Sequence, residues 1–256
     1  MLYNYHTHTI RCGHAVGSDK EYVEKAIKSG IKVLGFADHA PYIFACKDGH
    51  YKDQMPLNML NEYAQSVRKL KKEYQTDIEI LLGFEVEYYP NFHKKEMELL
   101  GTVKPDYLIL GQHYLHEQRA DLYVYAPTHD IKDLNDYVDN VLEGLRTGCF
   151  LYLAHPDLMQ FNGCIDGEKK KEAYIRLCQG AKNMSIPLEI NLLGLSKNRG
   201  YPTEEFFRIA GEIGNDIVIG YDAHEPQMFL QTELIEKAML LVEKYNLNLL
   251  KEPFRR

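Results

Sequence analysis

The chain has 256 residues, of which 45% are hydrophobic and 26% charged, and its formal net charge at pH 7 is −7. This composition is ordinary for a globular protein, and the acidic balance offers no basic surface for nucleic acid or for an anionic membrane. The length suffices for a sizeable core. No repeat, low-complexity tract or linker divides the chain, so we expect one domain over residues 1–256.

The five cysteines are odd in number, scattered, and contain no Cys-x-x-Cys pair. This pattern argues against a disulfide framework and favours a reducing compartment. The N-terminus has no basic stretch followed by an apolar run, so no signal peptide is expected. No apolar run approaches the ~20 residues that a membrane span needs. We therefore expect a cytoplasmic protein that does not contact a membrane.

Short apolar runs alternate with amphipathic stretches along the whole chain. Strands are predicted just before His6 and over residues 33–37, 78–84, 106–111, 150–154, 187–191 and 216–220. Helices are predicted over residues 20–29, 57–74, 92–100, 133–145, 169–181, 204–212 and 233–245. The first helix has a candidate N-cap, Ser18, and a candidate C-cap, Gly30. Because parallel strands need a crossover connection, this alternation predicts an α/β fold with a parallel sheet.

Two pairs of residues near the chain ends favour a closed sheet over an open one. Residues two apart on an extended chain point the same way, so His6 and His8 should converge, as should Asp222 and His224. A doubly wound open sheet would keep the first and last strands apart. A (β/α) barrel with seven strands would bring their ends together, and its active face lies at the carboxyl ends of the strands.

Side chains that bind metals follow six of the seven predicted strands. They are His6, His8, His39, Glu85, His113, His155, Asp222 and His224. One histidine after a strand is more often a loop or core residue, but six coincidences at the same structural position indicate a polynuclear metal site. Histidine with carboxylate and without thiolate suits Zn, Mn or Fe and does not choose among them.

These residues also form recognisable motifs. His6-Thr7-His8, Cys12-Gly13-His14, Asp38-His39, Glu85, His113, His155-Pro156 and Asp222-Ala223-His224 resemble the motifs of the PHP (polymerase and histidinol phosphatase) superfamily. The resemblance spans residues 6–224 and covers all nine ligand positions of the trinuclear members. It implies a distorted (β/α)7 TIM-like barrel with the metals at the carboxyl ends of the strands.

The resemblance also implies three divalent metal ions and assigns each ligand. His6, His8, Glu85 and Asp222 would hold one ion, and Glu85 would bridge to a second ion held by His113 and His155. The third ion would be held by His14, His39 and His224. His14 lies in a loop, so the residue pattern alone does not single it out.

The stretch Leu188-Glu189-Ile190-Asn191, with Gly194-Leu195 and Tyr201-Pro202, resembles the histidinol-phosphatase branch, as does Gly220-Tyr221-Asp222-Ala223-His224-Glu225-Pro226. There are two departures from that branch. Ser196-Lys197 stands where an Arg usually follows Gly-Leu, and Gln112 stands where a Ser-Val pair precedes the fourth-strand histidine. If a phosphate-binding Arg is needed, Lys197 or Arg199 must replace it.

The implied reaction is hydrolysis of L-histidinol phosphate to L-histidinol and phosphate, a step of histidine biosynthesis. Two metals bridged by Glu85 would lower the pKa of a shared water from ~15.7 towards ~7, and the hydroxide would attack phosphorus in line. Glu85 and Asp222 are therefore the central predicted catalytic carboxylates. The metals would also neutralise the phosphoryl oxygens.

Five further residues are candidates with simpler alternatives. Asp157 and Glu87 are candidates for proton transfer, but Asp157 would equally cap a turn and Glu87 would equally orient a ligating histidine. Arg199 offers a planar donor fork to phosphate and Lys197 a weaker charge, the alternative being solvated loop cations. Tyr42 would wall the substrate pocket or simply pack.

Two other functions compete with this reading. One is a PHP phosphoesterase of different specificity, acting on another small phosphomonoester, on phosphotyrosine or on a nucleic acid as an exonuclease. A nuclease would need a basic path for the backbone, which this chain lacks. The other is a non-catalytic metal-binding module, which would have no reason to retain nine ligands. The expected partner is a small phosphorylated substrate.

Overall fold

In the computed structural model, residues 2–44, 53–116, 123–125, 130–159, 167–251 and 254 are described. Seven strands are assigned among them, in two sheets. The first sheet has the order β1 (Tyr3–Asn4), β2 (Val33–His39), β3 (Glu79–Val86) and β4 (Tyr107–Leu110). The second has the order β5 (Leu188–Asn191), β6 (Asp216–Gly220) and β7 (Asn248–Leu249). Every pairing between these strands is parallel, as predicted.

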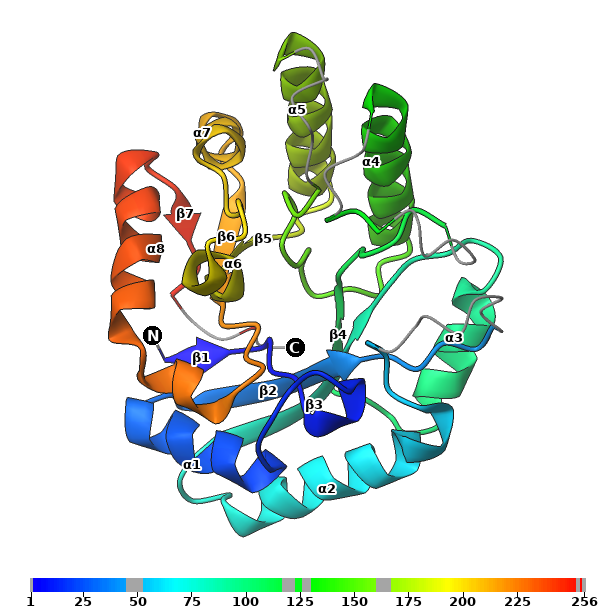
Figure 1. Ribbon diagram of the computed structural model, residues 1–256, viewed down its shortest axis with the longest axis vertical. Helices are drawn as coiled ribbons and strands as arrows, with labels where there is room; N and C mark the ends of the chain where they lie inside the picture. The colour runs from blue at the N-terminus through cyan, green and yellow to red at the C-terminus, as the bar shows by residue number, and fades with distance from the viewer. Residues whose placement is uncertain are drawn as a thin grey trace.

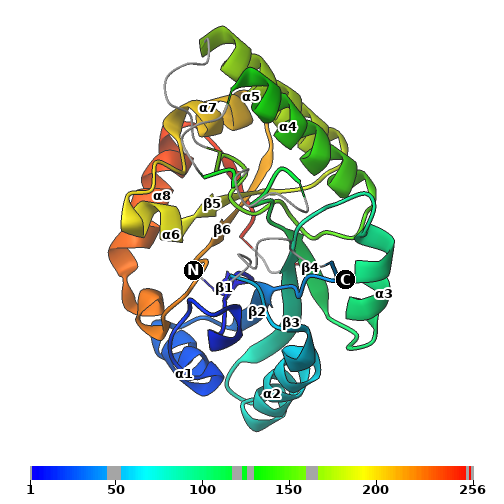
Figure 2. The same cartoon turned by 45° about the vertical axis from the view of Figure 1, so that its right-hand side comes forward.

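Isolated bridges connect the two sheets on both sides. Leu153 bridges to Leu110 of β4 and to Leu188 of β5. On the other side, Thr7 after β1 bridges to Ala223 after β6. The sheet is therefore curled rather than flat, and helices lie outside it (Figures 1 and 2).

The predicted fifth strand is wrong as a regular strand. Residues 150–154 form backbone hydrogen bonds to both neighbours, but only Leu153 is assigned, as a bridge residue. The next residue, His155, has a left-handed φ of 28°, so the extended backbone cannot continue. One strand and one α-helix were not predicted, β7 and the short helix α6 (Leu192–Lys197).

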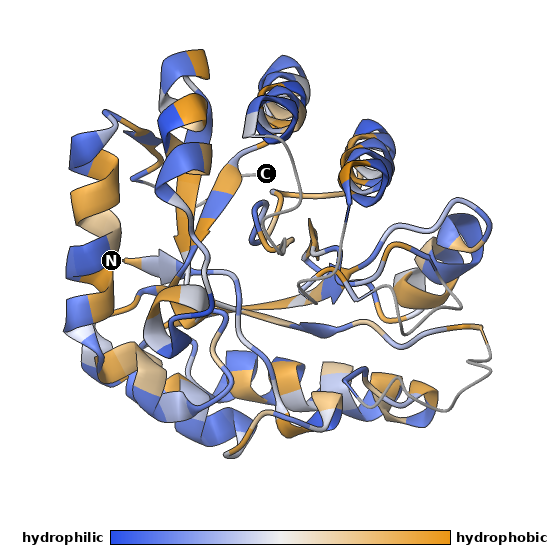
Figure 3. Ribbon diagram, turned by 45° about the horizontal axis from the view of Figure 1, so that its top comes forward, coloured by the Kyte–Doolittle hydropathy of each residue, from blue (hydrophilic) through white to orange (hydrophobic). Residues whose placement is uncertain are grey.

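The predicted helices are confirmed, with ends that shift by at most three residues. They are α1 (Asp19–Ser29), α2 (Leu60–Glu73), α3 (His93–Gly101), α4 (Ile131–Arg146), α5 (Gly167–Asn183), α7 (Glu204–Ile213) and α8 (Thr232–Lys244). Short 3₁₀ turns are η1 (Ile10–Cys12), η2 (Leu57–Met59) and η4 (Pro226–Leu230). The helices carry both apolar and polar faces (Figure 3). Burial of the apolar faces against the sheet is the main source of helix stability.

Both predicted caps of α1 are confirmed. The Ser18 side chain accepts a hydrogen bond from the Glu21 backbone, and the Glu21 carboxylate accepts one from the Ser18 backbone. Gly30 ends the helix with a left-handed φ of 85°.

Besides the core between the helices and the sheet, a smaller hydrophobic core lies inside the curled sheet. It consists of Tyr3, Tyr5, Val33, Ala37, Tyr107, Ile109, Tyr152, Ala154 and Val218. The hydroxyl of Tyr107 donates to the carbonyls of Tyr5, at 2.7 Å, and Phe36, at 3.0 Å. Side chains therefore fill the interior below the carboxyl ends of the strands and leave those ends for polar groups. No helix among the described residues is long and apolar enough to cross a membrane.

Candidate metal centre

The structure brings the nine predicted ligand side chains together at the carboxyl ends of the strands. They are His6, His8, His14, His39, Glu85, His113, His155, Asp222 and His224. Two of them lie within strands rather than after them, because β2 continues to His39 and β3 to Val86. His14 follows η1, whose Gly13 ends the turn with a left-handed φ of 83°.

The Glu85 carboxylate lies at the centre of the group. Its Oε1 is 2.7 Å from Nε2 of His155 and 3.7 Å from Nε2 of His113. Its Oε2 is 3.0 Å from Nδ1 of His39. The same Oε2 is 3.5 Å from Nε2 of both His6 and His8. Burial opposes ionisation, but the surrounding histidines outweigh it and hold the pKa of Glu85 well below its ordinary value.

Asp222 is the second central carboxylate. Its Oδ1 is 3.0 Å from Nε2 of His8, 3.3 Å from Nδ1 of His224 and 3.5 Å from Nε2 of His6. Burial again opposes ionisation, and His6 is the largest of the contributions that keep the pKa of Asp222 well below its ordinary value. Burial opposes protonation of the neighbouring histidines, but the carboxylates around them outweigh it and raise the pKa of His6 well above its ordinary value and that of His113 to about 9.

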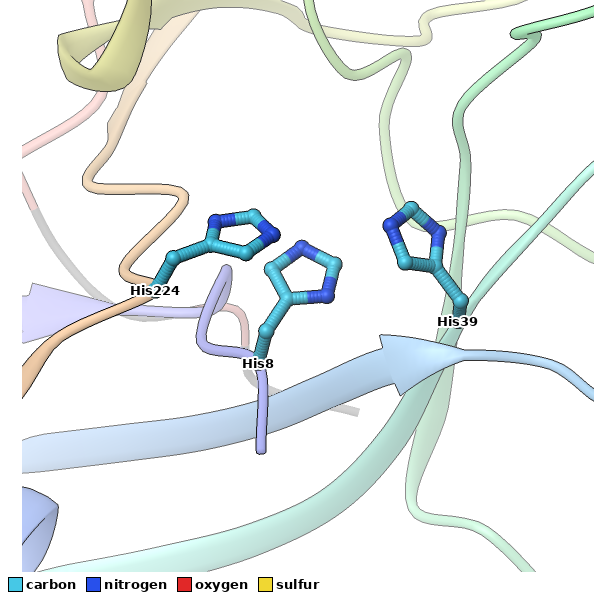
Figure 4. A group of neighbouring side chains, drawn as sticks. All are labelled: His8, His39 and His224. Carbon is cyan, nitrogen blue, oxygen red and sulfur yellow. The ribbon is translucent and has the colours of Figure 1, made fainter. Parts of the chain in front are cut away.

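A group of three histidine rings contacts both carboxylates. His8, His39 and His224 point toward a common space from three strand ends (Figure 4). Burial lowers the pKa of His8 and of His39 to about 3, so both rings are neutral and each retains a lone pair. His14 completes the group, with its Nε2 2.8 Å from Nε2 of His224.

Several buried atoms of these side chains have no hydrogen-bond partner among the described residues. They include Nε2 of His6 and His8, Oε2 of Glu85 and Oδ1 of Asp222. Buried polar atoms are costly when left unpaired. The convergence of these unpaired ring nitrogens with two ionised carboxylates fits cations, so the group is able to hold metal ions.

Other polar residues contact the backs of these rings. Oε1 of Glu87 is 3.1 Å from Nδ1 of His113, and Oδ1 of Asp38 is 3.4 Å from Nδ1 of His8. The hydrogen bond to Glu87 fixes which ring nitrogen of His113 faces the cluster. Glu87 therefore occupies the orienting position that was the alternative to proton transfer.

Sequence reasoning missed one such residue, Glu189. Its Oε1 accepts a hydrogen bond from Nδ1 of His6 at 2.8 Å. The available signal was a carboxylate in the middle of the predicted buried strand 187–191.

The cluster forms one wall of a cavity of about 380 Å³, within the size range of small-ligand pockets. Arg199, Lys197, Asp53 and Glu225 are among the other lining residues, with Tyr114, Tyr123 and Tyr201. Lys197 is half-exposed, with its Nζ 3.6 Å from Oε1 of Glu225. The Arg199 guanidinium lies 6.0 Å from the ring centroid of Tyr125. Both cations predicted to bind phosphate thus face the cavity.

The predicted proton-transfer candidate Asp157 and the predicted pocket residue Tyr42 are not among the described residues that line this cavity. Asp157 is 2% exposed, and its carboxylate accepts a hydrogen bond from the Thr203 backbone. Burial raises the pKa of Asp157 to about 6. The Tyr42 hydroxyl accepts a hydrogen bond from Nε2 of Gln54 at 3.2 Å. Its ring stacks on that of Phe44, with 4.7 Å between the ring centroids.

Residues 4–192 match the family model of the PHP domain. The chain belongs to the PHP family. A protein from Deinococcus radiodurans named probable histidinol-phosphatase is 30% identical over 227 residues, which cover 86% of this PHP chain and 85% of that protein. The histidinol-phosphatase of Bacillus subtilis is 30% identical over 139 residues, half of each chain.

A solved structure shares the fold of this PHP protein. It is the histidinol phosphate phosphatase of Lactococcus lactis, described as a complex with zinc, L-histidinol and phosphate. The TM-score is 0.75 at 20% identity, covering 97% of this chain and 95% of that one. The resemblance seen in the sequence motifs is confirmed at the level of family and fold.

Proposed function

We propose that this PHP protein is a metal-dependent phosphomonoesterase that hydrolyses L-histidinol phosphate to L-histidinol and phosphate. The observation that carries the proposal is a cavity with the buried histidine–carboxylate cluster on one wall and Arg199 and Lys197 among the other lining residues. The names of the Deinococcus and Bacillus relatives support the choice of substrate.

We propose that the cluster holds three divalent ions, with Zn, Mn or Fe as candidates. The proposed ligands are His6, His8, Glu85 and Asp222 for the first ion, Glu85, His113 and His155 for the second, and His14, His39 and His224 for the third. The unpaired buried atoms of His6, His8, Glu85 and Asp222 support the assignment of the first ion. When bound, such ions acidify water and neutralise phosphoryl charge.

The cavity residues divide into two charge classes. Arg199 is partly buried and offers a planar fork that matches phosphate oxygens, so we assign it the main phosphate contact. Lys197 is exposed and already near Glu225, so its contribution should be smaller. Asp53 and Glu225 are placed to attract the cationic amine of histidinol phosphate.

For Glu87 and Asp157, the observed contacts favour the structural alternatives over proton transfer. The Glu87 carboxylate contacts the back of His113, which favours orientation of that ring over proton transfer. The Asp157 carboxylate accepts from the Thr203 backbone, the N-cap residue of α7, which favours a turn cap. Tyr42 packs against Phe44, which favours packing over substrate contact.

Three broader expectations remain proposals. The bridges at Leu153 and Thr7 support closure of the curled sheet into a distorted (β/α)7 barrel. One hydrophobic cluster extends from Tyr22 to Leu247, which supports a single domain over residues 1–256. A cytoplasmic location accords with a biosynthetic reaction.

The test is phosphate release from L-histidinol phosphate beside p-nitrophenyl phosphate and phosphotyrosine. The protein is first chelated and then supplied with Mn²⁺ or Zn²⁺. A strong preference for histidinol phosphate that chelation abolishes and metal restores would support the proposal. Metal-dependent turnover of the generic substrates alone would keep the chemistry and reject the substrate. No turnover with Mn²⁺, with Zn²⁺ or, in a further assay, with Fe²⁺ would reject both.

A further inference from the structure

Strand β5 (Leu188–Asn191) is the one strand of the predicted barrel to which no metal ligand is assigned, yet it carries two buried polar side chains. Glu189 and Asn191 are two residues apart and so point to the same face of the sheet. Glu189 is 0% exposed and Asn191 is 1% exposed. Burying a carboxylate and an amide is costly unless both are fully hydrogen-bonded.

The Glu189 carboxylate accepts four hydrogen bonds, two on each oxygen. Oε1 accepts from Nδ1 of His6 at 2.8 Å and from the hydroxyl of Tyr152 at 3.2 Å. Oε2 accepts from the backbone N–H of His155 at 3.0 Å and from Nδ2 of Asn191 at 2.9 Å. Asn191 Nδ2 also lies 3.1 Å from Oδ2 of Asp222. The pair thus contacts three proposed ligands.

The contact with His6 decides which ring nitrogen is available. Because Nδ1 donates its proton to Glu189, the neutral ring that binds a metal carries its lone pair on Nε2. That Nε2 faces the carboxylates of Glu85 and Asp222 at 3.5 Å each and has no hydrogen-bond partner among the described residues. Glu189 therefore prepares His6 to bind a cation.

The other two contacts are made with residues that have unusual backbone conformations. His155 and Asp222 have φ values of 28° and 51°, in the left-handed region that residues other than glycine rarely adopt. Such conformations persist where surrounding contacts enforce them. Glu189 Oε2 binds the backbone N–H of His155, and Asn191 binds the side chain of Asp222.

The neighbouring strand is shaped to admit this carboxylate. A Cβ atom on Gly220 of β6 would lie 1.8 Å from Oε1 of Glu189. Any side chain at position 220 would therefore displace the carboxylate from His6. The absence of a side chain there gives Glu189 its place under the cluster.

We propose that Glu189, together with Asn191, is the positioning pair that orients His6, His155 and Asp222 for metal binding. The inference rests on the proposed metal site but not on the identity of the substrate. The proposal divides the ligands into those of the first two proposed ions and those of the third. The first two proposed ions depend on the pair, whereas the ion proposed for His14, His39 and His224 does not.

The test is metal binding by Glu189→Gln. Its amide offers one acceptor and one donor where Glu189 offers two acceptors, so either the His6 or the His155 contact is lost. Zn²⁺ affinity is measured on the metal-free full-length protein by competition with a chromophoric chelator, and Co²⁺ binding by its visible spectrum. We expect affinity for two ions to fall about 10- to 100-fold and the remaining ion to bind as in the wild type.

The matched control is Glu96→Gln, which removes another buried carboxyl, 4% exposed, in α3. It should leave all affinities unchanged. Wild-type affinities in Glu189→Gln, or the same loss in Glu96→Gln, would overturn the inference while leaving the proposed function intact. A wild-type protein that binds no ion would overturn both.

A second variant keeps the inference testable if Glu189→Gln does not fold. Asn191→Ser retains a side-chain oxygen to cap α6, the role that Asn191 plays toward Gly194, but lacks the amide that contacts Glu189 and Asp222. We expect weaker binding of the ion held with Asp222, with the thermal unfolding of the metal-free protein little changed. Unchanged Zn²⁺ affinity in this variant would overturn the role of the pair.

Discussion

The Nε2 atoms of His14 and His224 lie only 2.8 Å apart, although the Nδ1 atom of each ring lies beside a backbone carbonyl, of Cys12 at 3.0 Å and of Asp222 at 2.9 Å. A ring that donates its Nδ1 proton carries a lone pair on Nε2, so two lone pairs face each other. A shared proton or a cation removes this repulsion. The pair is therefore a contact that a metal ion would stabilise.

The first prediction follows from this pair. His14→Ala should lower the number of tightly bound Zn²⁺ ions by one and reduce the rise in unfolding temperature that Zn²⁺ produces, because ligand binding to the native state stabilises it. Metal content after dialysis and thermal unfolding measure both. His116→Ala, an exposed histidine, is the control and should match the wild type. Unchanged stoichiometry in His14→Ala would refute the assignment.

Glu85→Ala should abolish hydrolysis while leaving the fold, because five histidines lose their shared carboxylate. The loss of several kcal/mol of charge stabilisation corresponds to about a thousandfold or more in kcat. Steady-state phosphate release and circular dichroism measure activity and fold. Glu79→Ala removes an exposed carboxylate at the start of the same strand and should be neutral. Near-normal activity of Glu85→Ala would exclude Glu85 as a bridging ligand.

Adding a methyl group at Gly111 should impair metal binding and hydrolysis, as Glu85→Ala is expected to. A Cβ atom at that position would lie 1.9 Å from Oε1 of Glu85, so Gly111→Ala must displace the carboxylate. We expect reduced Zn²⁺ content and at least a tenfold loss of kcat. Gly101→Ala is the matched change, because nothing lies within 4 Å of a Cβ there, and it should stabilise α3 by about 0.5–1 kcal/mol. Equal behaviour of the two variants would contradict the steric argument.

Because Arg199 is assigned the main phosphate contact, its loss should reduce kcat/KM more than the loss of Lys197. Arg199→Gln should lower kcat/KM about 10- to 100-fold, the value of a hydrogen bond to a charged group. Lys197→Gln should lower it less, since Lys197 is exposed and lies 3.6 Å from Glu225. Arg208→Gln, on α7 beside Glu212, serves as the control for loss of an arginine. A larger effect at Lys197 than at Arg199 would reverse the assignment.

Buried Glu96 predicts a pH dependence of stability. Burial, with Glu87 second, raises the pKa of Glu96 to about 8 from its ordinary value of 4.5. Below pH 4.5 the carboxyl is protonated in the folded and unfolded states alike, so its full contribution is present there. As the pH rises toward 8, the unfolded chain ionises first and the folded state loses stability, by at most about 1.4 kcal/mol per pH unit.

Glu96→Gln should therefore be more stable than the wild type near pH 8 and similar to it near pH 4. Urea unfolding at several pH values measures the difference. A stability difference that does not change with pH would contradict the raised pKa.

Much of the local structure could be predicted because its causes are local. The α1 caps at Ser18 and Gly30 depend on hydrogen bonds and backbone angles within a few residues. Strand β6 was predicted at Asp216–Gly220, its observed bounds, because an apolar run lies between turn signals. Residues 150–154 failed as a regular strand because backbone pairing depends on both neighbours, and the φ of His155 interrupts it.

The sequence by itself determined the parallel α/β alternation and the order of the histidines and carboxylates, since both are patterns along the chain. Only the tertiary structure decided that Glu189 contacts His6 from 183 positions away, that Asp157 faces Thr203 rather than the cavity, and that Arg199 faces it. Spacing along the chain predicts which side chains point the same way. It does not predict which atoms meet across strands, because that depends on how the curled sheet packs those strands together.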